Sequence, residues 1–221
     1  MDLQHKEILH RYFPEETVDQ VSSILLRHAI QLKLTRTRIT KLGDYRPPLR
    51  GKGHRITING SLGRHMIYLV FLHELAHLLV WNKYGNKARP HGRQWKEEFA
   101  SLLQNAIYHA LIPGHLKEQV LDFSKNIKAT FAAHPALWKA LRVIDSGSLQ
   151  QVMVEDIPLD GLFVAANGRL FKREDKIRTR YRCYCLSNHR RYLFHAMAVV
   201  QPVEEEKIMQ YKYQPNYYEQ K

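Results

Sequence analysis

Hydrophobic and polar residues in the first quarter of the chain follow patterns that predict a helix and a short sheet. Apolar positions between 15 and 33 recur with helical spacing, and acidic residues open this stretch, as the helix dipole favours. Residues 34–40 alternate and are rich in β-branched side chains, so they predict a strand with a basic face. Residues 54–59 predict a second strand, and the proline-containing stretch 43–48 predicts a loop.

An apolar run from 66 to about 82 predicts the buried central helix of a domain. The run is shorter than the roughly 20 residues of a transmembrane helix. It contains His73-Glu74-Leu75-Ala76-His77, in which the two histidines project from one helix face. Both imidazoles can then reach one zinc ion at roughly 2.0–2.1 Å, which offsets the cost of burying them. Glu74 can take a proton from the water that attacks a substrate.

The sequence after this helix predicts a third metal ligand. Residues 84–86 predict the end of the helix, and Pro90 keeps the chain extended before a second helical pattern that runs from 93 to about 111. A helix, a reversal and a second helix can bring His91 back beside the two motif histidines. Because a catalytic zinc usually has three protein ligands and one open position, we predict one catalytic Zn²⁺, held by His73, His77 and His91.

The full motif reads His73-Glu74-x-x-His77, then thirteen residues, then His91-Gly92-x-x-Trp95. It resembles the motif of the SprT-like metallopeptidases, which include the Spartan proteases. The Tyr84-Gly85 turn and the segment from Arg89 to Arg93 are similar to the bacterial members in particular. The resemblance covers roughly residues 15 to 110. It implies a small gluzincin-like (zincin) fold, zinc bound by the three histidines, Glu74 as the catalytic base, and protein substrates attached to or crosslinked with DNA.

The second half of the chain predicts a helical connector and then a small β-domain. From Gln150 the hydrophobic pattern changes to period two, and Asn167-Gly168 is a strong hairpin signal. The expected strands lie at 152–154, 162–165, 170–172, 178–186, 191–194 and 198–200. We therefore predict an α+β fold with four parts: a metallopeptidase domain (1–111), a helical connector packed on its core (112–149, with helices at 116–131 and 135–143), a basic antiparallel β-domain (150–203) and a polar tail (204–221).

The charge of the chain favours a polyanionic partner. Thirty-four lysines and arginines against twenty-one acidic residues give a net charge of +13, and each phosphate that a cation neutralises releases counterions. Arg178, Arg180 and Arg182 alternate, which predicts one basic strand face, and Tyr184 or Tyr192 could stack on bases. A solvated basic face is the alternative. The candidate contacts to DNA, which we expect to be independent of base sequence, are Arg169, Lys172, Arg173, Lys176, Arg178, Arg180, Arg182, Arg190 and Arg191.

The two cysteines do not predict a disulfide framework or a second metal site. Cys183 and Cys185 are separated by one residue, a strained spacing for a disulfide, so we expect free thiols. Several SprT-like proteins carry a four-cysteine zinc ribbon at this place. Here the two cysteines with His189 and His195 match a four-ligand zinc site poorly, so we expect a degenerate ribbon held by its hydrophobic core.

The N-terminal residues lack the apolar core of a signal peptide, and no later run is long enough to span a membrane. We expect a cytoplasmic protein without a membrane partner, associated with the nucleoid if it binds DNA.

Three functions fit these observations. The first is a DNA-associated zinc metalloendopeptidase, with Tyr84, Arg89 or Arg93 as the residue that stabilises the oxyanion. The second is a metallopeptidase whose substrates are unrelated to DNA. The third is a non-proteolytic nucleic-acid-binding protein with a structural zinc, for which Glu74 beside the first ligand would have no purpose.

Overall fold

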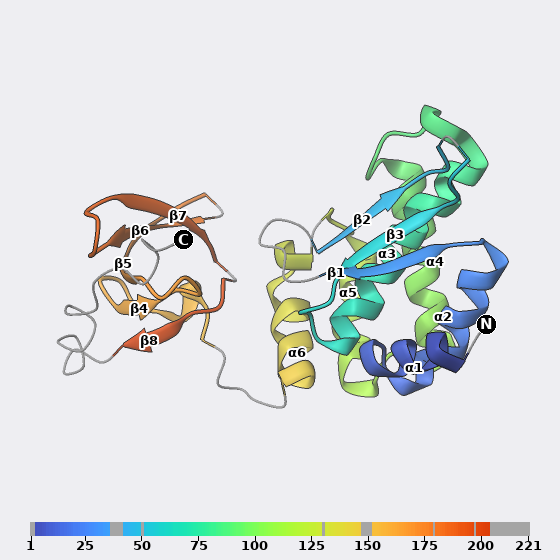
Figure 1. The fold of residues 1–221 in the computed structure, drawn as a ribbon. Helices are drawn as coiled ribbons and strands as arrows, with labels where there is room; N and C mark the ends of the chain where they lie inside the picture. Colours follow the sequence, from blue (N-terminus) through green and yellow to red (C-terminus); the bar gives the residue numbers. More distant parts are fainter. Residues whose placement is uncertain are drawn as a thin grey trace. The chain divides into compact units, whose positions relative to one another are not determined.

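The structure is a computed structural model of the 221-residue chain. The chain divides into two compact units, 1–147 and 148–221. Helices and two β-sheets make the fold mixed α and β (Figure 1). The predicted tail, 204–221, lies outside the described residues, which are 3–35, 42–49, 51–129, 131–146, 152–178, 180–196 and 198–203.

Helices dominate the first unit. The predicted helix at 15–33 is shorter than expected, because α2 (Val18–Arg27) ends in a left-handed C-terminal turn. Ala29 has a φ of +47°, and the Ile30 N–H donates to the Leu25 carbonyl oxygen at 2.9 Å. No glycine marks this stop in the sequence. The helices are α1 (Leu3–Tyr12), α2 (Val18–Arg27), α3 (Arg64–Tyr84), α4 (Arg93–Tyr108), α5 (Gly114–Lys125) and α6 (Pro135–Ser146), with short 3-10 helices η1 (Glu15–Thr17), η2 (Gly85–Lys87) and η3 (Phe131–Ala133).

A three-stranded sheet lies against α3 in the order β1-β3-β2. β1 (Gln31–Thr35) is parallel to β3 (Arg55–Asn59), and β2 (Gly43–Arg46) is antiparallel to β3. The strand predicted at 54–59 is confirmed, whereas the part of the first predicted strand at 36–40 lies outside the described residues. The loop predicted at 43–48 is wrong, since this stretch contains β2. An edge strand pairs along one side only and tolerates the prolines that follow it.

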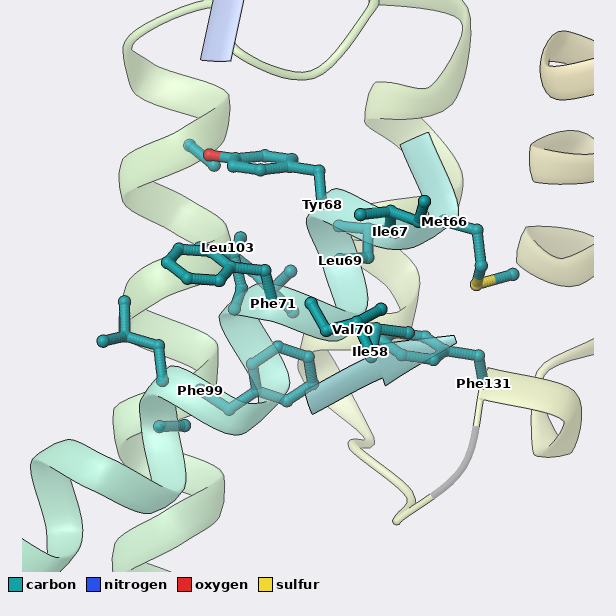
Figure 2. Close-up of a cluster of buried hydrophobic side chains, with 14 of the residues drawn as sticks. Ile58, Met66, Ile67, Tyr68, Leu69, Val70, Phe71, Phe99, Leu103 and Phe131 are labelled. Carbon is teal, nitrogen blue, oxygen red and sulfur yellow. The ribbon is translucent and has the colours of Figure 1, made fainter. Parts of the chain in front are cut away.

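The core of the first unit is built around α3, which is buried on nearly every side. Its apolar side chains pack against Ile58 of β3, Phe99 and Leu103 of α4, and Phe131 (Figure 2). Full burial of one such side chain contributes roughly 1.5–3 kcal/mol. These contacts fix α3 at the centre of the unit.

Helix α6 is attached to the beginning of α3. The backbone N–H groups of His65 and Met66 donate to the two carboxylate oxygens of Asp145 at 2.9 and 3.1 Å. The His65 ring nitrogen Nδ1 lies 2.8 Å from the same carboxylate. Asp145 thus caps α3 from eighty residues away, and a carboxylate at this end also interacts favourably with the helix dipole.

The second unit contains a five-stranded antiparallel sheet in the order β7-β6-β5-β4-β8. Gly168, with a φ of +74°, forms the predicted hairpin between β4 and β5. The strands predicted at 152–154 and 198–200 are wrong. Met153 and Val199 form only an isolated bridge, and the Asp156 carboxylate bonds to the Met153 N–H and closes a helical turn. The elements are η4 (Val154–Asp156), β4 (Leu162–Val164), β5 (Leu170–Ile177), β6 (Arg180–Cys185), β7 (Arg191–His195) and β8 (Gln201–Val203).

One face of this second sheet carries an aromatic core. The Phe171 ring centroid lies 5.6 Å from that of Phe163 and 4.8 Å from that of Phe194. Cys183 and Cys185 are buried on the same face. Among the helices that the structure describes, none is both long and apolar enough to cross a membrane.

Candidate metal centre

Three histidine side chains meet beside the middle of α3. His73 and His77 extend from successive turns of this helix, and His91 extends from the loop between η2 and α4. The Nε2 atom of His91 lies 3.1 Å from Nε2 of His77 and 3.2 Å from Nε2 of His73. All three ligand atoms lie within 4.8 Å of one another, so the group could hold a metal ion.

The spacing of these nitrogens fits the geometry of a tetrahedral site. Two nitrogens at roughly 2.05 Å from one zinc ion, separated by the tetrahedral angle, lie about 3.3 Å apart. The observed separations of 3.1 and 3.2 Å are close to this value. Imidazole donors suit zinc and several other first-row metals. The residues present therefore fit a bound metal ion of this class.

The histidines are neutral at physiological pH. Burial, with a smaller contribution from the two neighbouring imidazoles, lowers the pKa of His73 to about 3. Burial and then the His91 ring lower the pKa of His77 to about 4, and burial also lowers the pKa of His91. A neutral imidazole has one nitrogen lone pair available to a metal, so the centre is prepared for ligation.

A tight turn presents the third histidine. The Gly92 N–H donates to the Arg89 carbonyl oxygen at 2.9 Å and closes a four-residue turn with Pro90 at its second position. His91 is the third residue and has a φ of +57°, as a type II turn requires. Glycine or asparagine normally fills this position, and another residue there costs roughly 1 kcal/mol or more. The turn that places the third imidazole therefore requires a strained backbone conformation at His91.

Trp95 packs against all three imidazoles. Its ring centroid lies 4.6 Å from those of His73 and His91 and 5.2 Å from that of His77. The indole N–H donates to the His73 carbonyl oxygen at 3.4 Å. Trp95 is part of the sequence motif, but sequence reasoning gave it no role. Its place on the first turn of α4, next to a ligand, was the available signal.

The histidines open into a cleft of about 640 Å³. Glu74, which is only 6% exposed, lines this cleft with them. Further lining comes from 42–47, which includes β2, from the loop at 85–91, and from Phe131. The sequence did not identify β2 or Phe131 as parts of the site, because β2 resembles a loop and no local pattern links Phe131 to the motif.

Residues 6–111 match the model of the SprT-like family. This segment is an SprT-like domain. Proteins named Protein SprT from Salmonella arizonae, Salmonella newport and Salmonella heidelberg are 61% identical to the chain over 31 residues. The aligned stretch covers 14% of this chain and 18% of each relative, so the chain matches less than a fifth of their length. No solved structure matches the chain significantly.

The three candidates for oxyanion stabilisation differ in the pocket that each of them lines. Arg89 lines the cleft of the SprT-like domain together with the three histidines. Arg93 lines a second, smaller pocket beside His91, and Tyr84 lines neither of the two. Of the three candidates, Arg89 is thus the one that lines the cleft with the histidines and Glu74, and its role stays a prediction.

The nine candidate DNA-binding cations also differ in their surroundings. Arg191 and Lys172 form ion pairs with Glu174 and Asp160 at 3.0 and 2.8 Å. Arg173 donates to the Ile157 carbonyl oxygen at 2.7 Å.

Arg173 and Lys176 also lie over the ring of Tyr181, at 4.2 and 5.4 Å from its centroid. Arg180 and Arg182 project from the outer face of β6, away from the buried cysteines. The prediction that Arg178 shares this strand face is wrong, since Arg178 lies in the β5–β6 turn with a φ of +54°. Arg169 and Arg190 are exposed in turns.

The cysteine pair and its neighbouring histidines do not gather at one point. Cys183 and Cys185 are free thiols on the core face of β6, and burial raises the pKa of Cys183 to about 11. His195 pairs in register with Arg180 and therefore lies on the opposite face of the sheet. His189 hydrogen-bonds to the Tyr184 hydroxyl at 2.8 Å. Within the described residues, the cluster close enough to hold a metal ion is that of the SprT-like domain.

Proposed function

We propose that this chain is a zinc-dependent metalloendopeptidase whose SprT-like domain has a zincin-like catalytic core. The observation that carries the proposal is the convergence of His73, His77 and His91 in a cleft that also contains Glu74. A purely structural metal site is closed by a fourth ligand and needs no carboxylate beside it. The family match adds independent support over residues 6–111.

Zinc bound by the three histidines would polarise the scissile carbonyl and acidify the attacking water. Glu74 takes the proton from the water and passes it to the leaving amine, as a general base and then a general acid. Its burial in the cleft keeps the carboxylate close to the reaction and away from bulk solvent. Arg89, which lines the same cleft, is our candidate for stabilising the developing oxyanion.

β2 gives the cleft a means of holding an extended substrate. It is one of the two edge strands in the order β1-β3-β2, and its residues line the cleft with the histidines. A peptide can add to a sheet edge through main-chain hydrogen bonds that do not depend on the peptide's sequence. Such binding suits an endopeptidase that accepts many protein segments.

We further propose that the substrates are proteins bound to or crosslinked with DNA, and that the second unit holds the DNA. The net charge of +13 and the outward arginines on β6 support this partner. Arg180 and Arg182, with Arg169, Arg178 and Arg190 in the turns, are the strongest candidates. These five arginines are exposed or half-buried, and they form no ion pair with the residues that the structure describes.

The test is cleavage of a DNA-binding protein by the zinc-loaded chain, with and without single- and double-stranded DNA, beside Glu74→Gln. Cleavage that requires both DNA and Glu74 supports the whole proposal. Cleavage that requires Glu74 but is unaffected by DNA supports the peptidase function and contradicts the proposal that the substrates are linked to DNA. Zinc and DNA binding without cleavage in either protein would contradict the enzymatic function.

A further inference from the structure

Gly43 brings the backbone of β2 into direct contact with the catalytic base of the proposed peptidase. It is the first residue of β2 and pairs with Ile58 of β3. A side chain at this position would point toward α3. A β-carbon at this position would lie 2.6 Å from Oε1 of Glu74 and 3.0 Å from Cγ of the same side chain. It would also lie 2.7 Å from Cγ1 of Val70. Such distances are shorter than van der Waals contact.

Of the two neighbours, Val70 cannot move aside easily. Val70 is 1% exposed in the centre of α3, and a β-branched side chain in a helix has one strongly preferred rotamer. Glu74 is 6% exposed and lies in the same row of α3, one turn further on. A larger residue at 43 would therefore displace either the β2 backbone or the Glu74 carboxylate. Both line the cleft.

We propose that Gly43 is a positioning residue, whose missing side chain lets β2 hold the Glu74 carboxylate in place beside the three histidines. The inference rests on the proposed function, because it deepens the account of the same site. It also explains why a strand begins with a glycine, a residue that weakens strands and often marks a close approach of the backbone to another group.

The activity test compares Gly43→Ala with Gly53→Ala in the full chain. An added β-carbon at Gly53 meets only the Ala29 carbonyl oxygen at 3.4 Å, an ordinary contact, so this variant is the matched control. We expect Gly43→Ala to lower kcat about 100-fold, since a misplacement of about 1 Å can have this effect. KM should change less than about threefold, zinc content should stay at the wild-type value, and Gly53→Ala should keep wild-type kcat.

A second test is independent of catalysis. Overpacking typically destabilises a protein, so Gly43→Ala should lower the Tm of the metal-free chain by roughly 3–10 °C. In a Glu74→Ala background, which removes Oε1 and Cγ, the same substitution should lower the Tm by less, because only the contact with Val70 remains. This coupling can be measured even if no substrate is cleaved, so it separates failure of the inference from failure of the proposed function.

Loss of kcat with zinc retained, together with the coupling in Tm, supports the positioning role. Three outcomes would overturn it: wild-type kcat in Gly43→Ala, loss of zinc in parallel with kcat, or equal Tm changes in the wild-type and Glu74→Ala backgrounds. The last two would show that Gly43 serves only the packing of the sheet.

Discussion

The two units carry their candidate chemistry in opposite ways. In the SprT-like domain the polar groups are buried, close together and directed into one cleft. In the second unit the cations lie on the surface, and several are paired with carboxylates or lie over an aromatic ring. Buried polar groups need specific partners, whereas an exposed cation is stable in water without one. Single substitutions should therefore have large effects in the first unit and small, additive effects in the second.

The largest expected effect on binding is the loss of zinc affinity in His77→Ala. Replacing even the partners behind metal ligands costs about 10–100-fold in affinity, so removing a ligand should cost more than about 100-fold. Competition with a chromophoric chelator measures this affinity. His65→Ala is the matched control, because His65 lies on the same helix but contacts Asp145 instead of the centre. Equal zinc affinities in wild type and His77→Ala would show that His77 is not a metal ligand.

Acidification should destabilise the metal-free SprT-like domain through its buried histidines. The folded-state pKa of His77 is lowered to about 4, below its ordinary value of 6.5, chiefly by burial and then by the His91 ring. The unfolded chain therefore binds more protons below pH 6.5, and stability is lost as pH falls from there toward 4. At pH 5 this effect of His77 lowers the free energy of unfolding by about 2 kcal/mol.

Urea unfolding of the metal-free chain at pH 7.5 and pH 5 measures this loss. His77→Leu lacks the ionisable group but keeps the other acid-sensitive residues. It should lose about 2 kcal/mol less than wild type between the two pH values. Identical losses in the two proteins would mean that His77 is accessible to protons in the folded state.

The arginines of the second unit should contribute moderately to DNA binding. Arg180→Ala combined with Arg182→Ala should weaken binding roughly tenfold at physiological salt and reduce the salt dependence by about two phosphate contacts. The matched control, Lys172→Ala with Arg191→Ala, removes two cations that already have carboxylate partners. Its effect should be below about threefold. A larger effect in the control would reverse the assignment of the DNA-binding face.

The smallest effect concerns the strained turn at the metal centre. In the metal-free chain, His91→Gly should be more stable than His91→Ala by about 1 kcal/mol, because only glycine adopts a φ near +57° without strain. Ala88 has an ordinary φ of −84°, so Ala88→Gly should instead lower stability. Chemical denaturation compares the four proteins. A His91→Ala variant at least as stable as His91→Gly would show that the turn relaxes.

The metal centre could be predicted from the sequence because helix geometry alone fixes the first two ligands. Residues 73 and 77 share a helix face in any helix, and the proline and glycine beside His91 mark a reversal. The left-handed conformation of His91 could not be predicted, since that φ usually belongs to glycine or asparagine.

Other parts of the structure depend on contacts between distant residues. β2 resembles a loop in the sequence because its strand character comes from pairing with β3 and from its edge position. Phe131 reaches the cleft only through the packing of α5 and η3. The pairing of Arg191 on β7 with Glu174 on β5 spans the intervening strand β6, so a count of charges could not separate paired from unpaired arginines.

The central claim is that Glu74 acts on a substrate beside a metal held by three histidines. Zinc content and peptide-bond cleavage measured on the same samples of wild type and Glu74→Gln test it most directly. The account predicts one zinc per chain in both proteins and a loss of cleavage of at least about 1,000-fold in the variant. Equal cleavage by the two zinc-loaded proteins, or loss of zinc from Glu74→Gln, would contradict it.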